Sequence, residues 1–426
     1  MKYIFVFVLV LNVSNCIDFI KLKFKRDYVN SITEDNIIDE LVTNYISVPL
    51  LVGTPSQSLR LNLKLSVYPT YIISENVKKD QVKYNRMKST TFVSDHNLYY
   101  FDYDELFMGE KANDTFIIDD SKNKVDDFVF CLETDANMDD WLKVNSGVIG
   151  LDVSYKKSLQ TEDTNFIMQI KKKLNLLSYD FVIRYIDEDE GEIVIGAMPH
   201  QISEEYKKEA FVGTNTINYN AYLYWGLEFE NISYGDKGNI ENVSHIGLFE
   251  IETGVIKCPK EFFEYLNENV FKEFIDSNQC TIENKDTLSY FVCNSKAPFK
   301  KINDISFYQR DFNYTFTLSP SDLLYSYKDQ FYYLVISDSS SSVWTLGKQF
   351  LKKYPLLFNP DKKLIGFYKP LPSSSNILHN LFILSLIIII ILLLFFIIKF
   401  FILNKRRMKR AIELDDGFDY TPAIAP

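Results

Sequence analysis

The sequence contains only 4 histidines among its 426 residues, scattered with no cluster of cysteines or carboxylates around them. Because zinc sites are built from such clusters, we expect no metal, and no motif points to a cofactor. Basic residues are also in deficit, with 46 lysines and arginines against 57 aspartates and glutamates, a net charge of −11. This acidic balance argues against nucleic acid as a partner.

Charge is missing altogether from two stretches near the ends of the chain. An apolar run over residues 3–11 is too short to cross a bilayer and is followed by small residues up to Cys16. This pattern is typical of a secretory signal peptide, residues 1–16. Residues 381–398 contain no charge, and the apolar character continues to Leu403. At about 1.5 Å per residue, a helix over 381–403 would cross a hydrocarbon core of roughly 30 Å.

The orientation in the membrane is predicted from a basic cluster at residues 405–410. Such clusters stay on the cytoplasmic side, so we expect residues 404–426 to form a cytoplasmic tail. The ectodomain would then end in a stalk at 371–380 and lie outside the cell or in a secretory or endolysosomal lumen, as in a single-pass type I protein. Acceptor triplets for N-glycosylation occur in it at Asn113, Asn231, Asn242 and Asn313.

Cysteine is scarce as well, with 5 in the chain, one of which is lost with the signal peptide. An oxidising compartment permits disulfides, and Cys280 with Cys293 would close a short loop. Cys131 and Cys258 are either buried free thiols or a second pair.

The ectodomain sequence predicts an all-β architecture. Apolar and aromatic runs of four to eight residues recur, separated by Gly, Asn, Asp or Pro. Helical periodicity occurs in a few places, such as residues 164–177 and 259–275.

Two features of the ectodomain occur twice. "NSGVIGLD" (145–152) is matched by "SVWTLGKQF" (342–350), and the strand that ends at Lys64 is matched by "HIGLFEIETGVIKCP" (245–259). This order predicts two similar halves that divide near residue 200.

These motifs resemble those of the pepsin-like aspartic peptidases over about residues 45–370. Gly53-Thr54-Pro55-Ser56-Gln57 resembles the turn before the first catalytic Asp-Thr-Gly, and residues 147–151 resemble the strand that braces it. Residues 343–370 resemble the closing segment of the family, and Cys280 with Cys293 suits its second-lobe disulfide. The resemblance implies a bilobal fold with a central cleft, an N-terminal lobe at 45–198 and a C-terminal lobe at 199–370.

At the catalytic positions the sequence departs from the family. Lys64-Leu65-Ser66 stands where the first Asp-Thr-Gly belongs, and Glu252-Thr253-Gly254 stands at the second. The family holds a water between two carboxylates, one acting as base and the other as acid. An ammonium at position 64 has no lone pair with which to accept the water's proton. The extra methylene of Glu252 would misplace its carboxylate by roughly 1.5 Å, enough to cost about 100-fold in rate.

The supports of the first loop are changed too. Leu65 lacks the hydroxyl that locks the two loops, and Ser66 replaces the glycine of the turn. Lys64 and Glu252 are expected to lie close enough to pair, since the family fold brings these loop ends together.

The substrate-covering hairpin of the family, called the flap, has a tyrosine with glycines near its tip. Here the corresponding stretch is rich in tyrosine but places Asp102 at that position. Tyr100, Phe101 and Tyr103 are the candidates for cleft contacts from this side, in a shifted register. An ordinary aromatic hairpin is the alternative.

Residues 17–44 resemble a short pro-region, because the basic stretch 21–26 is similar to the start of family propeptides. A solvated basic strand is the alternative.

The sequence therefore predicts a membrane-anchored aspartic peptidase homologue without catalytic activity that binds a peptide or protein in its cleft. The alternatives are an active aspartic endopeptidase with an atypical site and a mainly adhesive surface glycoprotein.

Overall fold

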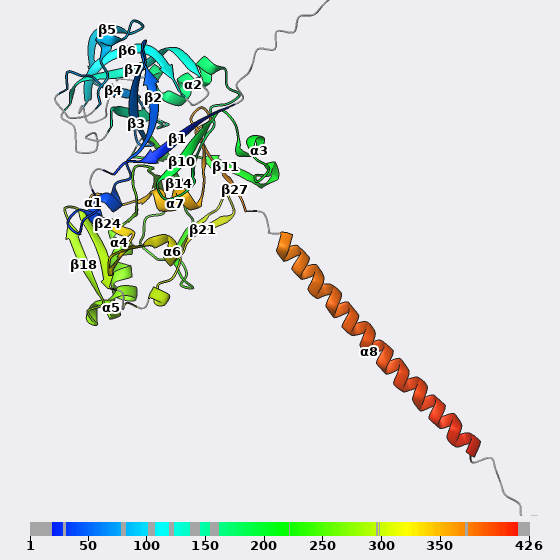
Figure 1. Ribbon diagram of the computed structural model, residues 1–426. Helices are drawn as coiled ribbons and strands as arrows, with labels where there is room; N and C mark the ends of the chain where they lie inside the picture. Colours follow the sequence, from blue (N-terminus) through cyan, green and yellow to red (C-terminus); the bar gives the residue numbers. More distant parts are fainter. Residues whose placement is uncertain are drawn as a thin grey trace, which may run out of the picture. The chain divides into compact units, whose positions relative to one another are not determined.

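The computed structural model describes residues 19–28, 31–77, 82–100, 107–118, 123–136, 145–153, 162–220, 222–294, 297, 299–370 and 374–415. The predicted signal peptide and residues 416–426 lie outside this part of the chain. Two units are separated at Lys369 and Pro370, and each is described by itself (Figure 1).

The first unit contains a 13-stranded sheet in the order β11-β27-β26-β9-β10-β1-β2-β3-β8-β4-β7-β6-β5. Its strands are β1 (Ile20–Arg26), β2 (Ile46–Val52), β3 (Gln57–Lys64), β4 (Tyr71–Ile73), β5 (Val93–Tyr100), β6 (Phe107–Ile117), β7 (Lys124–Ala136), β8 (Gly147–Gly150), β9 (Phe181–Tyr185), β10 (Glu190–Ile195), β11 (Phe211–Asn215), β26 (Leu357–Asn359) and β27 (Leu364–Tyr368).

A nine-stranded sheet and two small sheets complete the strands. The nine-stranded sheet comprises β14 (Gly226–Glu228), β16 (Ile246–Phe249), β17 (Ile256–Cys258), β18 (Cys280–Lys285), β19 (Leu288–Asn294), β22 (Leu324–Tyr327), β23 (Gln330–Tyr333), β24 (Val335–Asp338) and β25 (Trp344–Leu346). The small sheets comprise β12 (Ile217–Tyr219) with β13 (Tyr222–Tyr224), and β15 (Asn231–Tyr234) with β20 (Ile305–Gln309) and β21 (Tyr314–Leu318).

Helices are few and mostly short. They are α1 (Ile37–Val42), α2 (Phe166–Leu174), α3 (Pro199–Ile202), α4 (Lys260–Leu266), α5 (Lys272–Asp276), α6 (Pro320–Leu323), α7 (Lys348–Lys353) and α8 (Ser374–Asp415), with single turns η1 (Arg86–Lys88), η4 (Glu162–Thr164), η5 (Lys208–Ala210), η6 (Asn267–Phe271) and η7 (Phe299–Lys301). Both helical stretches predicted from periodicity are confirmed. The first is α2, whose N-cap Asn165 accepts a bond from the Met168 amide, and the second is the run from α4 through η6 to α5.

The same four-strand arrangement occurs twice in this unit. β3 runs parallel to β8, β8 antiparallel to β4, and β4 parallel to β7. β16, β25, β17 and β24 repeat these relations in the same order. A Cβ atom on Gly150 would lie 2.4 Å from the Tyr68 carbonyl oxygen, and one on Gly347 would lie 2.2 Å from that of Thr253. The two halves predicted from sequence therefore share one strand plan, with a glycine packed against each loop.

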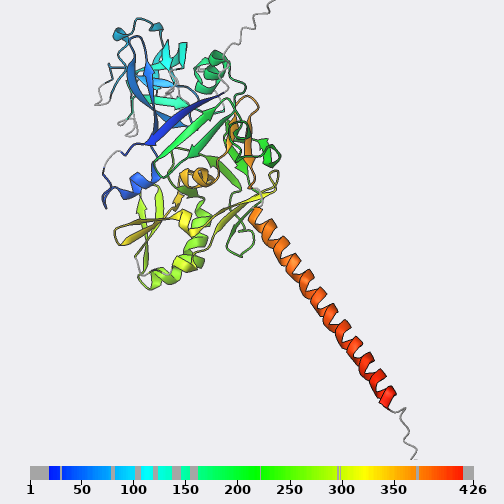
Figure 2. The ribbon, with the colours of Figure 1, turned by 45° about the vertical axis from the view of Figure 1, so that its right-hand side comes forward.

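The N-terminal segment, residues 19–28 and 31–44, contributes β1 to the 13-stranded sheet and packs α1 against the nine-stranded sheet. β1 pairs with β10 along Ile20–Lys25 and with β2 at its end, as Figures 1 and 2 show from two sides. Its alternating pattern buries Ile20, Leu22 and Phe24 and exposes the lysines between them. Helix α1 buries Ile37, Ile38 and Leu41 in a cluster with Val255 and residues of β19, β23 and β24. Burial of each such side chain contributes roughly 1.5–3 kcal/mol to the free energy of folding.

The predicted disulfide between Cys280 and Cys293 is confirmed, and it joins opposite residues of β18 and β19. Cys131 and Cys258 are buried free thiols, the first of the two alternatives drawn from sequence.

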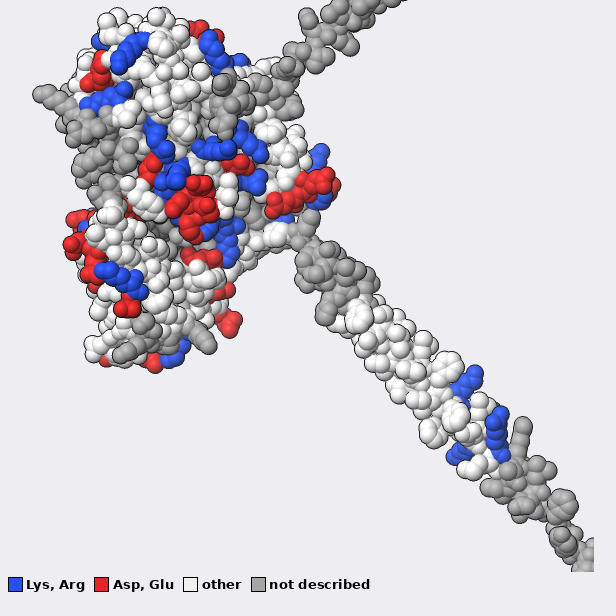
Figure 3. All heavy atoms as spheres, in the orientation of Figure 1, with Lys and Arg blue, Asp and Glu red and all other residues white. Residues whose placement is uncertain are grey.

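The second unit consists of α8 among the residues described. Within it, Phe382–Met408 is long and apolar enough to cross a membrane, with a mean hydropathy of 3.5 over its most apolar stretch. In Figure 3 the helix is uncharged along its middle and carries lysine and arginine toward its C-terminal end. A C-terminal membrane helix, as predicted, therefore has its structural counterpart.

Candidate functional site

The first loop follows directly from strand β3. Alternation along the strand buries Leu59, Leu61 and Leu63 and places Lys64 at its end, opposite Gly150 of β8. Leu65 then turns into the apolar core with 1% of its surface exposed, while Ser66 is exposed. Leu65, which the sequence resemblance places at the family's locking position, therefore has its side chain in the core, where it has no group that can form a hydrogen bond.

The second loop, Glu250–Gly254, connects β16 to β17 and is held through its main chain. The Asn44 amide donates to the Glu252 carbonyl at 2.7 Å, and the Gly254 amide donates to the Val42 carbonyl at 2.8 Å. On another side, the Lys348 amide donates to the Thr253 carbonyl at 2.7 Å. The N-terminal segment and α7 thus clamp this loop.

The two loops meet through the Glu252 side chain. The Leu65 amide donates to Glu252 Oε2 at 3.4 Å, and the Ser66 hydroxyl donates to Glu252 Oε1. Each oxygen of this carboxylate therefore accepts a bond from the first loop. Sequence reasoning counted Ser66 as a lost glycine and missed its hydroxyl, although a donor next to the expected pair of acids was a visible signal.

Lys64 lies in the same neighbourhood and is partly exposed. Burial is the main reason why the pKa of Glu250 is raised, and the positive charge of Lys64 is among the effects that oppose this rise. Pairing of Lys64 with Glu252 stays a prediction.

Glu250 is the second acidic side chain of this site and was not singled out from sequence. Burial raises the pKa of its carboxyl, and the charge of Glu252 raises it further. The Thr253 hydroxyl donates to Glu250 Oε2 at 2.9 Å. Both carboxyls of the site therefore come from one loop, and the Thr253 hydroxyl bonds within that loop.

Gly254 is placed where no side chain fits. A Cβ atom on it would lie 2.2 Å from the Leu41 carbonyl oxygen. The glycine thus lets the N-terminal segment approach the loop closely enough for the main-chain bond to Val42.

The flap candidates lie almost wholly outside the described residues. β5 and β6 form the hairpin, in which Tyr100 pairs with Met108 through the main chain. Phe101 and Tyr103 lie outside the described residues, and the contacts of these aromatic side chains stay a prediction.

The four predicted glycosylation sites differ in setting. Asn242 and Asn313 are exposed and have positive φ values of 62° and 43°. Asn113 lies within β6 with strands paired on both sides, and Asn231 lies within β15; both are partly buried. The surroundings favour the first two as acceptors.

Among the residues that the structure describes, no group of three or more His, Cys, Asp or Glu side chains is arranged to hold a metal ion.

Comparison with known families identifies the class of protein. The family described as eukaryotic aspartyl protease matches residues 44–369. The chain belongs to this family, which confirms the resemblance and the bilobal pepsin-like fold predicted from sequence. No curated protein matches the chain.

Proposed function

We propose that this protein is a membrane-anchored aspartic protease homologue that binds peptides or proteins without cleaving them. The basic cluster at residues 405–410, toward the C-terminal end of α8, supports a cytoplasmic tail, with the protease-like unit outside the cell or in a secretory or endolysosomal lumen. The fold is one that receives extended peptides, and strand pairing and side-chain pockets do not depend on catalytic acids.

The observation that carries the proposal is that both carboxylate oxygens of Glu252 already accept hydrogen bonds. Its two carboxylate oxygens accept bonds from the Leu65 amide and the Ser66 hydroxyl. The Glu252 carboxylate therefore links the two loops. Because its lone pairs accept these bonds, they are less available to accept a proton from a water molecule. Lys64 supplies a donor where the mechanism needs a second acid.

One observation favours the alternative, an active endopeptidase with an atypical site. Burial and the charge of Glu252 raise the pKa of Glu250, and a carboxyl with a raised pKa is one part of a catalytic acid–base pair. Against it, Glu250 is held by Thr253 within one loop, whereas the family reaction places its acids on opposite loops.

A cleavage assay distinguishes a homologue that only binds from an active endopeptidase. The purified full-length protein in detergent is incubated with unfolded casein between pH 3 and 6, with and without a statine-type inhibitor. We expect no cleavage above that of the Glu252→Gln variant. Cleavage abolished by both the inhibitor and this substitution would overturn the proposal.

Binding is tested separately with a peptide library and mass spectrometry of the retained peptides. We expect extended peptides to be retained intact, and a matched peptide N-methylated at alternate amides to bind at least about tenfold more weakly, since it lacks donors for strand pairing. Equal retention of both peptides would leave the cleft without a role and favour an adhesive glycoprotein.

A further inference from the structure

A cavity of about 350 Å³ lies beside the second loop, with Gly254 in its wall. The N-terminal segment, the β9–β10 turn, the α6–β22 stretch and the start of α7 form the remaining walls. Small-molecule sites begin at roughly this size.

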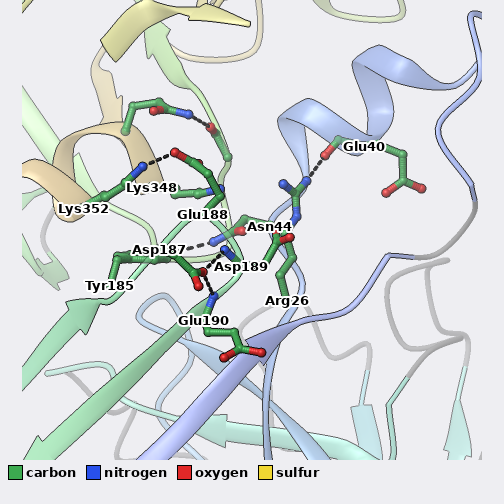
Figure 4. A network of polar contacts seen from close by, with 12 residues as sticks. Arg26, Glu40, Asn44, Tyr185, Asp187, Glu188, Asp189, Glu190, Lys348 and Lys352 are labelled. Carbon is green, nitrogen blue, oxygen red and sulfur yellow. Dashed lines mark hydrogen bonds and ion pairs between the residues drawn. The ribbon is translucent and has the colours of Figure 1, made fainter. Parts of the chain in front are cut away.

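Arg26 is the unusual group of this cavity. Its Nη2 donates to the carbonyl oxygens of Glu40 and Thr43, the latter at 3.2 Å, and the guanidinium stacks on the Tyr28 ring at 4.6 Å. In Figure 4 the guanidinium points to the main chain of Glu40, whose carboxylate points away. Among the described residues no carboxylate lies within ion-pair distance of Arg26, and its Nη1 and Nε have no hydrogen-bond partner. Because Nη2 already donates to two carbonyls, a carboxylate could accept a single charged hydrogen bond from either Nη1 or Nε.

The acidic groups that line the cavity have other partners. Glu188 pairs with Lys348 at 3.0 Å and with Lys352. Asp322 pairs with Lys353 at 2.6 Å. Asp189 Oδ1 accepts a hydrogen bond from the Tyr28 hydroxyl at 2.7 Å.

Lys348 adds a second cation to the wall, with only 3% of its surface exposed. Burial lowers the pKa of this lysine, and the charge of Arg26 lowers it too, although Glu188 opposes both effects. An anion near the two cations would relieve their repulsion.

Part of the cavity wall is aliphatic. Ile32, Leu41, Leu324 and Leu334 contribute to it. A ligand that contacts both the cations and these aliphatic side chains has a carboxylate and a small aliphatic group.

We propose that this cavity binds a carboxylate joined to a branched aliphatic group, with Arg26 holding the carboxylate. The C-terminal residue of a peptide that ends in leucine has this chemistry, and so does a free short-chain acid. Gly254 forms part of the wall, so the bound ligand would touch the main chain of the second loop.

The test uses the full-length protein in lipid nanodiscs, with empty nanodiscs as the blank. N-acetyl-leucine is titrated by saturation-transfer NMR, with N-acetyl-leucine amide as the uncharged match and 3-methylbutanoate as the free acid. We expect both acids to bind and the amide to bind at least about tenfold more weakly. Tighter binding of N-acetyl-leucine identifies the peptide end as the preferred source, and tighter binding of 3-methylbutanoate identifies the free acid.

Variants locate the site. Arg26→Gln should weaken acid binding about tenfold or more, whereas Lys21→Gln, on the same strand but outside the cavity, should not change it. Because Arg26→Gln risks destabilising the fold, Ser326→Glu serves as a second variant, since it adds a competing carboxylate at an exposed wall residue. Equal binding of acid and amide, no binding at all, or unchanged binding in Ser326→Glu and in folded Arg26→Gln would each overturn the proposal.

Discussion

The raised pKa of Glu250 predicts that the stability of the protein depends on pH. This raised pKa means that the folded chain binds this proton more tightly than the unfolded chain does. Above the ordinary glutamate pKa of about 4.3, ionising Glu250 therefore costs stability, and the cost disappears as the pH falls toward that value.

Glu250→Gln should remove this cost and keep an oxygen that accepts the Thr253 hydroxyl. We expect the variant to unfold roughly 2 °C above the wild type at pH 7, the effect of about 1 kcal/mol in a larger domain. The gain should shrink toward pH 4, as thermal unfolding from pH 4 to 8 will measure. A variant less stable than wild type at neutral pH would contradict the raised pKa.

The expected pair of Lys64 and Glu252 is a second prediction for single residues. Lys64→Met should destabilise the ectodomain by about 2 kcal/mol, less than the 3–5 kcal/mol typical of a fully buried pair because Lys64 is partly exposed. Combining it with Glu252→Gln should recover much of the loss. Denaturant unfolding of the four proteins in the cycle measures the coupling, and a coupling near zero would show that Lys64 serves other partners.

At the scale of the element, the contact of the N-terminal segment with the second loop depends on Gly254. Gly254→Ala should destabilise the protein by about 1–3 kcal/mol, because the new Cβ atom meets the Leu41 carbonyl, which as main chain cannot rotate away. Gly238→Ala is the matched control, since no atom lies within 4 Å of its Cβ position, and it should stay within about 0.5 kcal/mol. Equal stability of the two variants would mean that the N-terminal segment can move away from the new Cβ atom at little cost in free energy.

The elements were largely predictable from sequence, whereas their contacts were not. Period-2 alternation located the strand that ends at Lys64, and three- and four-residue spacing located α2, because both signals are local. The Ser66–Glu252 bond joins residues 186 positions apart, so it depends on how two loops pack and on side-chain length. Glu250 was missed for a similar reason, since the burial that raises its pKa depends on how the folded loop packs.

At the scale of the whole molecule, the orientation across the membrane can be tested through its glycans. Asn242 and Asn313 are exposed at positive φ, a setting that leaves room for a glycan. We expect Asn242→Gln and Asn313→Gln each to remove one glycosidase-sensitive step in electrophoretic mobility, and Asn231→Gln to change little. A protein without any such step would contradict a lumenal ectodomain.

The central claim is that this chain keeps the fold of a peptidase while its first loop has lost both the acid and the supports that aim it. Lys64→Asp restores only the acid, because Leu65 still lies in the core and Ser66 still occupies the turn. The most direct measurement is cleavage of unfolded casein by wild type and Lys64→Asp, side by side between pH 3 and 6. The account predicts no cleavage by either protein, and statine-sensitive cleavage by Lys64→Asp would show that the first loop is intact in geometry and contradict it.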